Sequence, residues 1–249
     1  MASVTPPLLV TRGLSKNFGG LTAVDGVDFE LPKGQIRAVI GPNGAGKTTF
    51  VSLVCGRIEP SAGRIMFDGS DVTGMPAHRR VRAGIAYTFQ ITSIFPRLSV
   101  FDNVALSVQR RLTDGKDEHL DGRSLEAGVA EALERSGLAA RSGEIAGNLA
   151  YGHQRLLEVA MGLALKPRLL ILDEPTQGLS DGEIESFTGL VREIAQEATV
   201  LLIEHNMPVV MELADRVSVL TNGRMLAEGT PDEIRADPAV QEAYLGTAA

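Results

Sequence analysis

Apolar positions along the chain recur with two spacings, one typical of strands and one typical of helices. In the first sixty residues, short apolar runs predict strands at "LLVTRGLSKNF", "AVDGVDFEL" and "QIRAVIG", with a turn at residues 32–34. From residue 95 to residue 166 the spacing becomes helical, and within residues 124–136 one face carries Leu125, Val129, Ala132 and Leu133. The polar run "RRLTDGKDEHLDGR" inside this lobe is interpreted as a solvated loop.

Strands and helices alternate in the last third of the chain. The runs "RLLILDE" and "TVLLIEH" predict buried strands, and the helical stripe between them carries Ile184, Phe187, Val191 and Ile194. This alternation is typical of a parallel sheet covered by helices. A hairpin is expected to turn at Asn222-Gly223, a type I′ signal, and two short helices are expected over residues 230–249.

Composition narrows the class of protein. The 249 residues are 44% hydrophobic and 22% charged, which is enough to bury a full core. The net charge of −7 argues against nonspecific binding to nucleic acid or anionic lipid, because both need a basic surface. No apolar run reaches about 18 residues and the start lacks the features of a secretory signal, so residence in the cytoplasm is expected. The single cysteine, Cys55, is expected on a buried helix face.

The strongest chemical motif is "GPNGAGKT", residues 41–48, which matches the phosphate-loop pattern G-x-x-x-x-G-K-[ST]. It follows an apolar strand and precedes a helical segment, as this pattern requires. Glycines let successive backbone N–H groups surround phosphates, Lys47 reaches the β- and γ-phosphates, and the Thr48 hydroxyl serves as a ligand for Mg²⁺. A nucleoside triphosphate site with Mg²⁺ is therefore predicted here.

Two further strand ends carry polar residues. Asp173 and Glu174 follow the buried run Leu169–Leu172, at the end of a strand where ligands lie in open α/β sheets. Asp173 suits the Mg²⁺ shell, and Glu174 suits a group that accepts a proton from an attacking water or orients that water. The run "LLIEHN" brings His205 to the same edge, where its imidazole is expected to contact the γ-phosphate.

The order of these motifs resembles that of the nucleotide-binding subunits of ATP-binding-cassette (ABC) transporters, over nearly the whole chain. "GPNGAGKTT" is followed by "TFQ", the helical lobe, "LAYGHQ", "LLILDEP", "GLSD" and "LLIEHN". The resemblance implies a single α/β ABC ATPase domain over residues 1–249. Its expected parts are a P-loop ATPase core with a parallel sheet and an N-terminal antiparallel β part (1–94 and 167–229), a helical signature lobe (95–166) and C-terminal helices (230–249).

The resemblance also implies roles for individual residues. Phe18 matches the aromatic residue that stacks on adenine, Gln90 matches a glutamine that senses Mg²⁺ and the membrane partner, and Glu174 and His205 match the general base and the switch histidine. The implied catalytic residues are Glu174, His205, Lys47 and Gln90, and the implied Mg²⁺ ligands are Thr48, Gln90 and Asp173. The implied ATP-binding residues are Phe18, Gly41, Pro42, Asn43, Gly44, Ala45, Gly46, Lys47, Thr48, Thr49, Leu149, Ala150, Tyr151, Gly152, His153 and Gln154.

The segment "LAYGHQ" takes the place of the signature loop of the family, usually L-S-G-G-Q, which closes on the γ-phosphate held by a second subunit. Ala150, Tyr151 and His153 depart from that pattern, and the missing serine hydroxyl removes a charge-assisted hydrogen bond worth roughly 1.5–3 kcal/mol. Gly152 still permits close approach of the backbone, and a helix expected to begin near Gln154 still points its positive end at phosphate. We therefore interpret the loop as that of a working ATPase, the alternative being a degenerate, inactive half-site.

Further segments resemble one branch of the family, the ATPase subunits of branched-chain amino acid uptake systems: "LAYG", "GIAYTFQ", "LSVFDNV" and "GTPDEIRADPAVQEAYLG". The implied function is to power an importer of branched-chain or other hydrophobic amino acids or related small solutes. The implied partners are permease subunits, a second ATPase subunit (the same chain or a related one) and, indirectly, a solute-binding protein, with no nucleic acid. The implied location is the inner face of the cell membrane, held there by the permease.

Two alternatives stay open. "SIFPRLSVFDN" and "GTPDEI" also resemble ATPases of lipopolysaccharide-type exporters. A soluble ABC ATPase of DNA repair, translation or cluster assembly is another class, although the chain lacks the coiled-coil insertion, tandem cassette and basic excess of the first two. Ser180 stands where the family often has aspartate, and Asp181 follows it, which leaves open how two ATP sites communicate.

Overall fold

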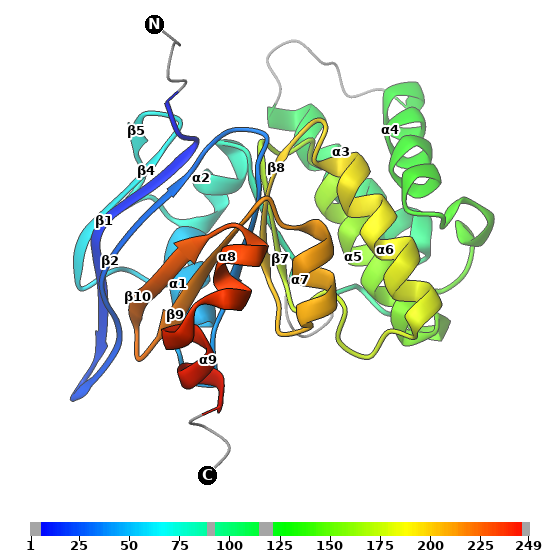
Figure 1. The fold of residues 1–249 in the computed structure, drawn as a ribbon. Coiled ribbons are helices and arrows are strands. Elements are labelled where there is room, and N and C mark those ends of the chain that lie inside the picture. The colour runs from blue at the N-terminus through cyan, green and yellow to red at the C-terminus, as the bar shows by residue number, and fades with distance from the viewer. Residues whose placement is uncertain (1–5, 89–92, 115–121, 246–249) are drawn as a thin grey trace, which may run out of the picture.

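The computed structural model describes residues 6–88, 93–114 and 122–245, and this part of the chain contains two β-sheets (Figure 1). The smaller sheet is antiparallel and has the strand order β2-β1-β4-β5. Its strands are β1 (Leu9–Phe18), β2 (Leu21–Leu31), β4 (Ala62–Phe67) and β5 (Ser70–Asp71).

The larger sheet has six strands in the order β10-β9-β3-β8-β7-β6. The strands are β3 (Ile36–Ile40), β6 (Ile85–Thr88), β7 (Leu169–Asp173), β8 (Thr199–Ile203), β9 (Arg216–Thr221) and β10 (Arg224–Gly229). All neighbouring pairs are parallel except β9 and β10, which form an antiparallel hairpin. Because β3, β8 and β7 are parallel neighbours, the loops that follow them emerge side by side at one edge of the sheet.

The helices cover both faces of this sheet and build a separate lobe on the right of Figure 1. They are α1 (Lys47–Val54), α2 (Ala77–Arg82), α3 (Val100–Asp114), α4 (Gly122–Arg135), α5 (Tyr151–Ala164), α6 (Asp181–Ile194), α7 (Met207–Leu213), α8 (Pro231–Ala236) and α9 (Pro238–Leu245), with short 3₁₀ turns at Ala139–Arg141 and Ala146–Asn148.

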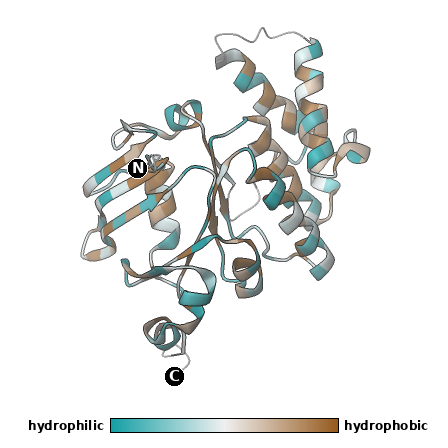
Figure 2. Ribbon diagram, turned by 45° about the horizontal axis from the view of Figure 1, so that its top comes forward, coloured by the Kyte–Doolittle hydropathy of each residue, from teal (hydrophilic) through white to brown (hydrophobic). Residues whose placement is uncertain are grey.

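The six-stranded sheet is apolar on both faces, which is why its strands read as continuous hydrophobic runs (Figure 2). On one face Val39, Ile171 and Leu201 pack with residues of α1 and of the antiparallel sheet, so that α1 lies between the two sheets. On the other face Leu170 and Leu172 pack with α5, α6 and α7. The sheet therefore holds its strand ends in a rigid frame.

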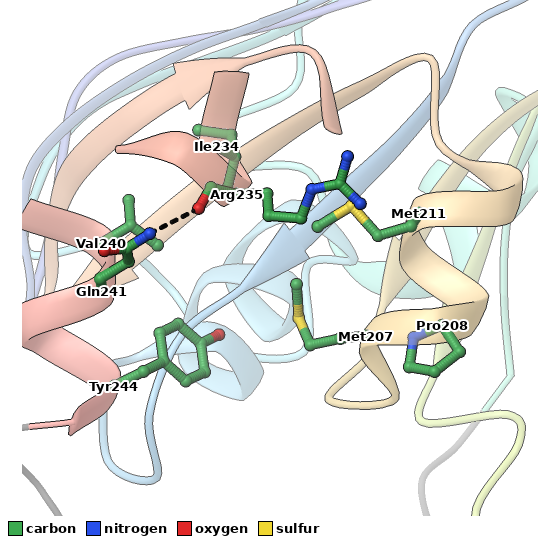
Figure 3. Close-up of a pocket in the computed structure, with 8 residues that line it drawn as sticks. All are labelled: Met207, Pro208, Met211, Ile234, Arg235, Val240, Gln241 and Tyr244. Atoms are coloured by element: carbon green, nitrogen blue, oxygen red, sulfur yellow. Dashed lines mark hydrogen bonds between the residues drawn. The ribbon is translucent and has the colours of Figure 1, made fainter. Parts of the chain in front are cut away.

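Helices α3 and α4 pack on α5, which joins the lobe to the sheet. Leu157 and Ala160 of α5 lie in the apolar cluster of the lobe, whereas Val159 and Leu163 lie in the cluster of the sheet. At the other end of the molecule, α8 and α9 pack against α7 and β9. Between α7 on one side and α8 and α9 on the other lies a pocket of about 550 Å³. Its lining is mainly apolar and includes Met207, Met211 and Tyr244 (Figure 3).

Most of the elements expected from the sequence are confirmed. The α/β class with a parallel sheet, an antiparallel N-terminal part and a helical lobe is present, and Cys55 is buried at the end of α1. The hairpin turns at Asn222-Gly223, where both residues have positive φ (49° and 77°), and Thr230 forms a capping box with Glu233 at the start of α8.

Two expectations were wrong. The polar run over residues 110–123 is not wholly a loop: α3 continues to Asp114 and α4 begins at Gly122, and residues 115–121 lie outside the described part. The cause is a buried stripe on α3 that continues into the polar run, formed by Val100, Val104, Val108 and Leu112. The helix expected to begin near Gln154 begins three residues earlier, at Tyr151.

Among the described residues, none of the helices combines the length and the apolar character that crossing a bilayer requires.

Candidate nucleotide-binding site

The loop of residues 41–48 leaves β3 and enters α1 in a conformation that only glycine can adopt at two positions. A Cβ atom on Gly41 (φ +152°) would lie 2.1 Å from the Leu220 carbonyl oxygen of β9. A Cβ atom on Gly46 (φ +97°) would lie 2.3 Å from the Ala23 carbonyl oxygen of β2. The loop backbone is therefore pressed against both sheets, which fixes its shape before any ligand binds.

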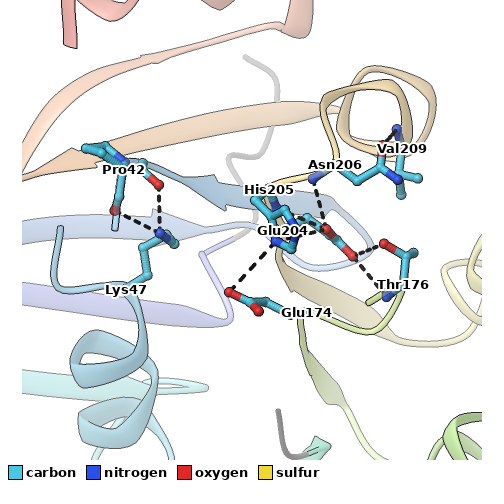
Figure 4. Close-up of polar contacts among 9 residues, drawn as sticks. Pro42, Lys47, Glu174, Thr176, Glu204, His205, Asn206 and Val209 are labelled. Atoms are coloured by element: carbon cyan, nitrogen blue, oxygen red, sulfur yellow. Dashed lines mark hydrogen bonds and ion pairs between the residues drawn. The ribbon is translucent and has the colours of Figure 1, made fainter. Parts of the chain in front are cut away.

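Lys47 is buried within this loop, and its ammonium group donates hydrogen bonds to the carbonyl oxygens of Gly41 (2.7 Å) and Pro42 (3.1 Å) (Figure 4). Burial lowers the pKa of Lys47, and the nearby carboxylates of Glu174 and Asp173 oppose that change. The cation is thus held between the phosphate loop and the two acidic residues at the end of β7. Of the neighbouring residues, Asn43, Gly44 and Thr48 are exposed, Pro42 and Thr49 are half-buried and Ala45 is buried.

Asp173 ends β7 with its side chain almost completely buried (1% exposed). Its Oδ2 accepts a hydrogen bond from the Tyr87 hydroxyl (2.7 Å), whereas its Oδ1 has no hydrogen-bond partner among the described residues. Burial raises the pKa of Asp173, and the hydrogen bond from Tyr87 opposes that change. A buried carboxylate oxygen without a partner fits a ligand to a hard cation such as Mg²⁺.

Glu174 follows in a left-handed conformation (φ +46°), which is uncommon for a residue with a side chain. Its N–H donates to the Ile203 carbonyl oxygen (2.8 Å), so the β7–β8 ladder extends one residue beyond the strand. The Glu174 Oε1 lies 3.9 Å from Nδ1 of His205, whose side chain is 59% exposed. The predicted base and the predicted switch histidine are therefore neighbours at the open edge of the sheet (Figure 4).

Phe18 lies at the end of β1, and its side chain is 48% exposed. It pairs with Leu21 on β2, the strand whose Ala23 touches Gly46 of the phosphate loop. The Lys16 ammonium lies 5.2 Å from the centre of the Phe18 ring. An open aromatic face near the phosphate loop suits stacking on a base. Gln90, expected beside Mg²⁺, lies outside the described residues.

The signature segment lies at the start of α5 and contacts the loop that follows β7. Tyr151 is 44% exposed, and its ring lies so close to Gly178 that a Cβ atom there would be 2.9 Å from Cε1. A Cβ atom on Gly152 would lie 2.1 Å from Oε1 of Glu183 on α6. Gly152 therefore lies against α6 as part of the helix and not in a free loop.

The other residues of the segment support the turn into α5. Leu149 is buried, and its carbonyl oxygen accepts a hydrogen bond from the Gln154 side chain (2.9 Å). His153 is half-buried. Ala150 is exposed and occupies the N-cap position without a side chain that could cap the helix. Ser180 takes the N-cap position of α6, and its N–H and hydroxyl both donate to Oε2 of Glu183.

Three residues of the site were missed from the sequence. Tyr87 hydrogen-bonds Asp173, and burial raises its pKa. Arg155 is buried, pairs with Glu158 (3.0 Å) and places its guanidinium 5.5 Å from the centre of the Tyr151 ring. Glu204, between β8 and His205, is buried and bonded to both neighbouring loops. The contacts of Tyr87 and Glu204 join residues of neighbouring strands that are far apart in the chain. No local sequence pattern could therefore predict them.

Comparison with known proteins places this geometry in a family. Residues 24–177 match the family described as ABC transporter, and residues 224–249 match the family described as branched-chain amino acid ATP-binding cassette transporter. The chain belongs to the ABC transporter family, as one of its ATP-binding, ATP-hydrolysing subunits. Members of this family work with the membrane-embedded subunits of a transporter.

Named relatives match along almost the whole chain. The chain is 38% identical to BraF of Pseudomonas aeruginosa, a high-affinity branched-chain amino acid transport ATP-binding protein, over 97% of this chain and 99% of that protein. It is 38% identical to LivG of Escherichia coli, which has the same description, over 98% of this chain and 100% of that protein. The crystal structure of the ADP conformation of an ATP-binding cassette from an ABC transporter has a TM-score of 0.86 and 29% identity, covering 97% of this chain and 100% of that one.

Proposed function

We propose that the chain powers the uptake of branched-chain or other hydrophobic amino acids, or of related small solutes, by hydrolysing ATP on the inner face of the cell membrane. The observation that carries the ATPase mechanism is the parallel order β3, β8, β7, which brings Lys47, His205 and Glu174 to one edge. Support for the cargo comes from BraF and LivG and from the match of residues 224–249.

The residues of the site divide the reaction between them. The backbone of the phosphate loop and the start of α1 bind the phosphates, and Lys47 supplies positive charge to the β- and γ-phosphates. Glu174 accepts a proton from the attacking water or orients it, while His205 donates a hydrogen bond to the γ-phosphate. Phe18 provides the face on which adenine stacks.

The residues that are present fit Mg²⁺. Thr48 and Asp173 would hold the ion together with phosphate oxygens, and Gln90 is a third proposed ligand that lies outside the described residues. When bound, Mg²⁺ neutralises charge on the phosphates. Because Mg²⁺ prefers few protein ligands, two or three side chains are sufficient.

The signature segment acts in a second subunit. Ala150–Gln154 would close on the γ-phosphate held by the partner, so that two ATP molecules lie between two subunits, either two copies of this chain or this chain and a related one. The dimer would drive permease subunits, which receive solute from a binding protein. Nucleic acid has no part in this cycle.

Glu174→Gln tests the proposed chemistry, because the amide keeps the shape of the side chain but cannot accept the proton. ATP binding should persist, turnover should fall by at least about 10²-fold, and ATP with Mg²⁺ should convert the variant from monomer to dimer on a sizing column. Glu185→Gln on the exposed face of α6 is the control and should behave like the unchanged protein. Turnover of Glu174→Gln near the wild-type rate would remove Glu174 from the mechanism.

Uptake of radiolabelled leucine tests the proposed cargo. Cells that carry Glu174→Gln in place of the unchanged chain should lose leucine uptake while the uptake of an unrelated sugar persists. If leucine uptake is unaffected and export of an envelope lipid fails, the exporter alternative replaces the importer.

A further inference from the structure

Glu204 is a fully buried carboxylate (0% exposed) between β8 and His205. Its Oε1 accepts hydrogen bonds from the N–H (3.0 Å) and the hydroxyl (2.5 Å) of Thr176. Its Oε2 accepts hydrogen bonds from the N–H groups of His205 (2.9 Å) and Asn206 (3.1 Å). Four donors therefore converge on one side chain (Figure 4).

This arrangement uses the full capacity of the carboxylate. An ionised carboxylate offers about four acceptor positions, and here each is matched by a donor. Burying such a group is unfavourable unless its hydrogen bonds are made, and an apolar residue at position 204 would leave three backbone N–H groups without a partner. Glu204 is thus suited to fix positions and not to fill space.

The two loops joined by Glu204 are those that carry the proposed chemistry. Thr176 lies two residues after Glu174, and His205 and Asn206 directly follow Glu204. Asn206 then begins α7 by accepting a hydrogen bond from Val209 N–H. Glu174, held in its left-handed conformation, faces His205 across 3.9 Å. Any loosening of the four bonds would change the distance between base and histidine.

We propose that Glu204 is a positioning residue, which acts through Thr176 and His205 to hold Glu174 and His205 at the spacing that the reaction needs. This inference rests on the roles proposed above for Glu174 and His205. Because Glu204 is fully buried, it is not expected to touch the nucleotide. Its effect should therefore fall on the rate of the chemical step and leave ATP affinity unchanged.

Thr176→Val is the mildest test, because valine has nearly the same shape and only the hydroxyl donor is lost. The kcat for ATP should fall about 10-fold, with KM changed by less than about 2-fold. Thr176→Ser restores the hydroxyl and should restore kcat. Thr113→Val, at an exposed position of α3, is the matched control and should leave kcat and KM unchanged.

Glu204→Gln is the stronger test, because the amide NH₂ would face donors on one side of the side chain. The expected loss in kcat is on the order of 10²-fold, as for a small displacement of reacting groups. A readout without nucleotide accompanies it: hydrogen exchange at the amides of Thr176, His205 and Asn206 should become faster in Glu204→Gln. Exchange in β3 and β8 should not change.

Two results would overturn the proposal. One is a wild-type kcat in both Thr176→Val and Glu204→Gln. The other is a fall in kcat that is accompanied by a lower melting temperature and faster exchange throughout the sheet, which is the signature of a structural role only. Failure of the proposed function is recognised by a different result, which is ATP turnover by Glu174→Gln near the wild-type rate. That result does not depend on how the variants at positions 176 and 204 behave.

Discussion

The phosphate-loop edge of the parallel sheet and the signature segment at the start of α5 would serve the same nucleotide, yet they are built differently. At the sheet edge, strand register places the residues, and lack of space fixes the backbone at Gly41 and Gly46: a Cβ atom on Gly46 would lie 2.3 Å from a carbonyl oxygen. In the signature segment Ala150 and Tyr151 are exposed, whereas Leu149 and Gly152 are buried.

This difference explains where the chain departs from the family pattern. The departures at Ala150, Tyr151 and His153 fall on positions whose side chains are exposed or half-buried. The glycine that is kept, Gly152, is buried against the carboxylate of Glu183, so a side chain there would have to displace that carboxylate. A site made by a helix N-terminus tolerates changed side chains because its backbone N–H groups remain in place.

The largest effect is expected at the rigid region, from Gly46→Ala. The new methyl group must displace the Ala23 carbonyl while the residue keeps a positive φ, so unfolding free energy should fall by about 2–5 kcal/mol and ATP binding should be lost. Gly44→Ala is the matched control, because φ is also positive (+79°) but nothing lies within 4 Å. Its expected loss is only about 1–2 kcal/mol.

Urea unfolding of the two variants measures this contrast. Equal losses for Gly44→Ala and Gly46→Ala would mean that backbone strain alone matters and that the contact with β2 does not hold the loop in place.

Much of the rigid region could be predicted, because its signals are local. The phosphate-loop motif and the buried runs that end at Asp173 and His205 mark three strand ends, and a parallel sheet brings such ends to one edge. The contacts of Glu204 could not be predicted, since they depend on which strands are neighbours and on a partner, Thr176, 28 residues earlier in the chain.

The start of α5 could not be predicted for a different reason. Tyr151, Gly152 and His153 have modest or poor helix propensity, so the local sequence favours a loop there. In the structure these residues are helical, and Gly152 is buried beside Glu183 of α6. For α3 the signal was present, because Leu112 continues the stripe of Val104 and Val108, but the surrounding charges hid it.

A smaller effect on stability is expected from Asp173→Asn. This substitution should raise the stability of the protein but abolish its activity. Burial holds the pKa of Asp173 above its unfolded value, so the ionised side chain opposes folding once the pH rises above that unfolded value. The asparagine cannot ionise and can still accept the hydrogen bond from Tyr87. The nucleotide-free variant should therefore melt higher at pH 8, by a few degrees at about 2–4 °C per kcal/mol, and should lose Mg²⁺-dependent turnover.

The pH dependence checks the cause. The difference in melting temperature between Asp173→Asn and the unchanged protein should shrink as the pH falls through the raised pKa of Asp173 toward the unfolded value of about 4. Asp68→Asn is a control of opposite sign, because hydrogen bonds from Arg168 and Lys33 lower the pKa of Asp68 to about 2. Removal of the Asp68 carboxylate should therefore lower the melting temperature at pH 8. A higher melting temperature for both Asp68→Asn and Asp173→Asn would contradict the argument.

The smallest effect is expected in the tolerant region, from Ala150→Ser. Ala150 occupies the N-cap of α5 without a capping side chain, and a serine hydroxyl there can accept a hydrogen bond from a first-turn N–H. Stability should rise by about 1 kcal/mol, seen as an increase of about 2–4 °C in melting temperature, whereas Ala150→Val, with no hydroxyl, should give no increase.

The same hydroxyl also tests the link between the two regions. A hydroxyl has two acceptor positions and one donor, so the side chain introduced by Ala150→Ser can cap α5 and still donate to the γ-phosphate of a partner subunit. ATP-driven dimerisation of Ala150→Ser in the Glu174→Gln background should then be tighter than with Ala150. If the melting temperature rises but dimerisation and turnover do not change, the backbone N–H groups of α5 already suffice for the phosphate, and the missing hydroxyl weakens only the helix.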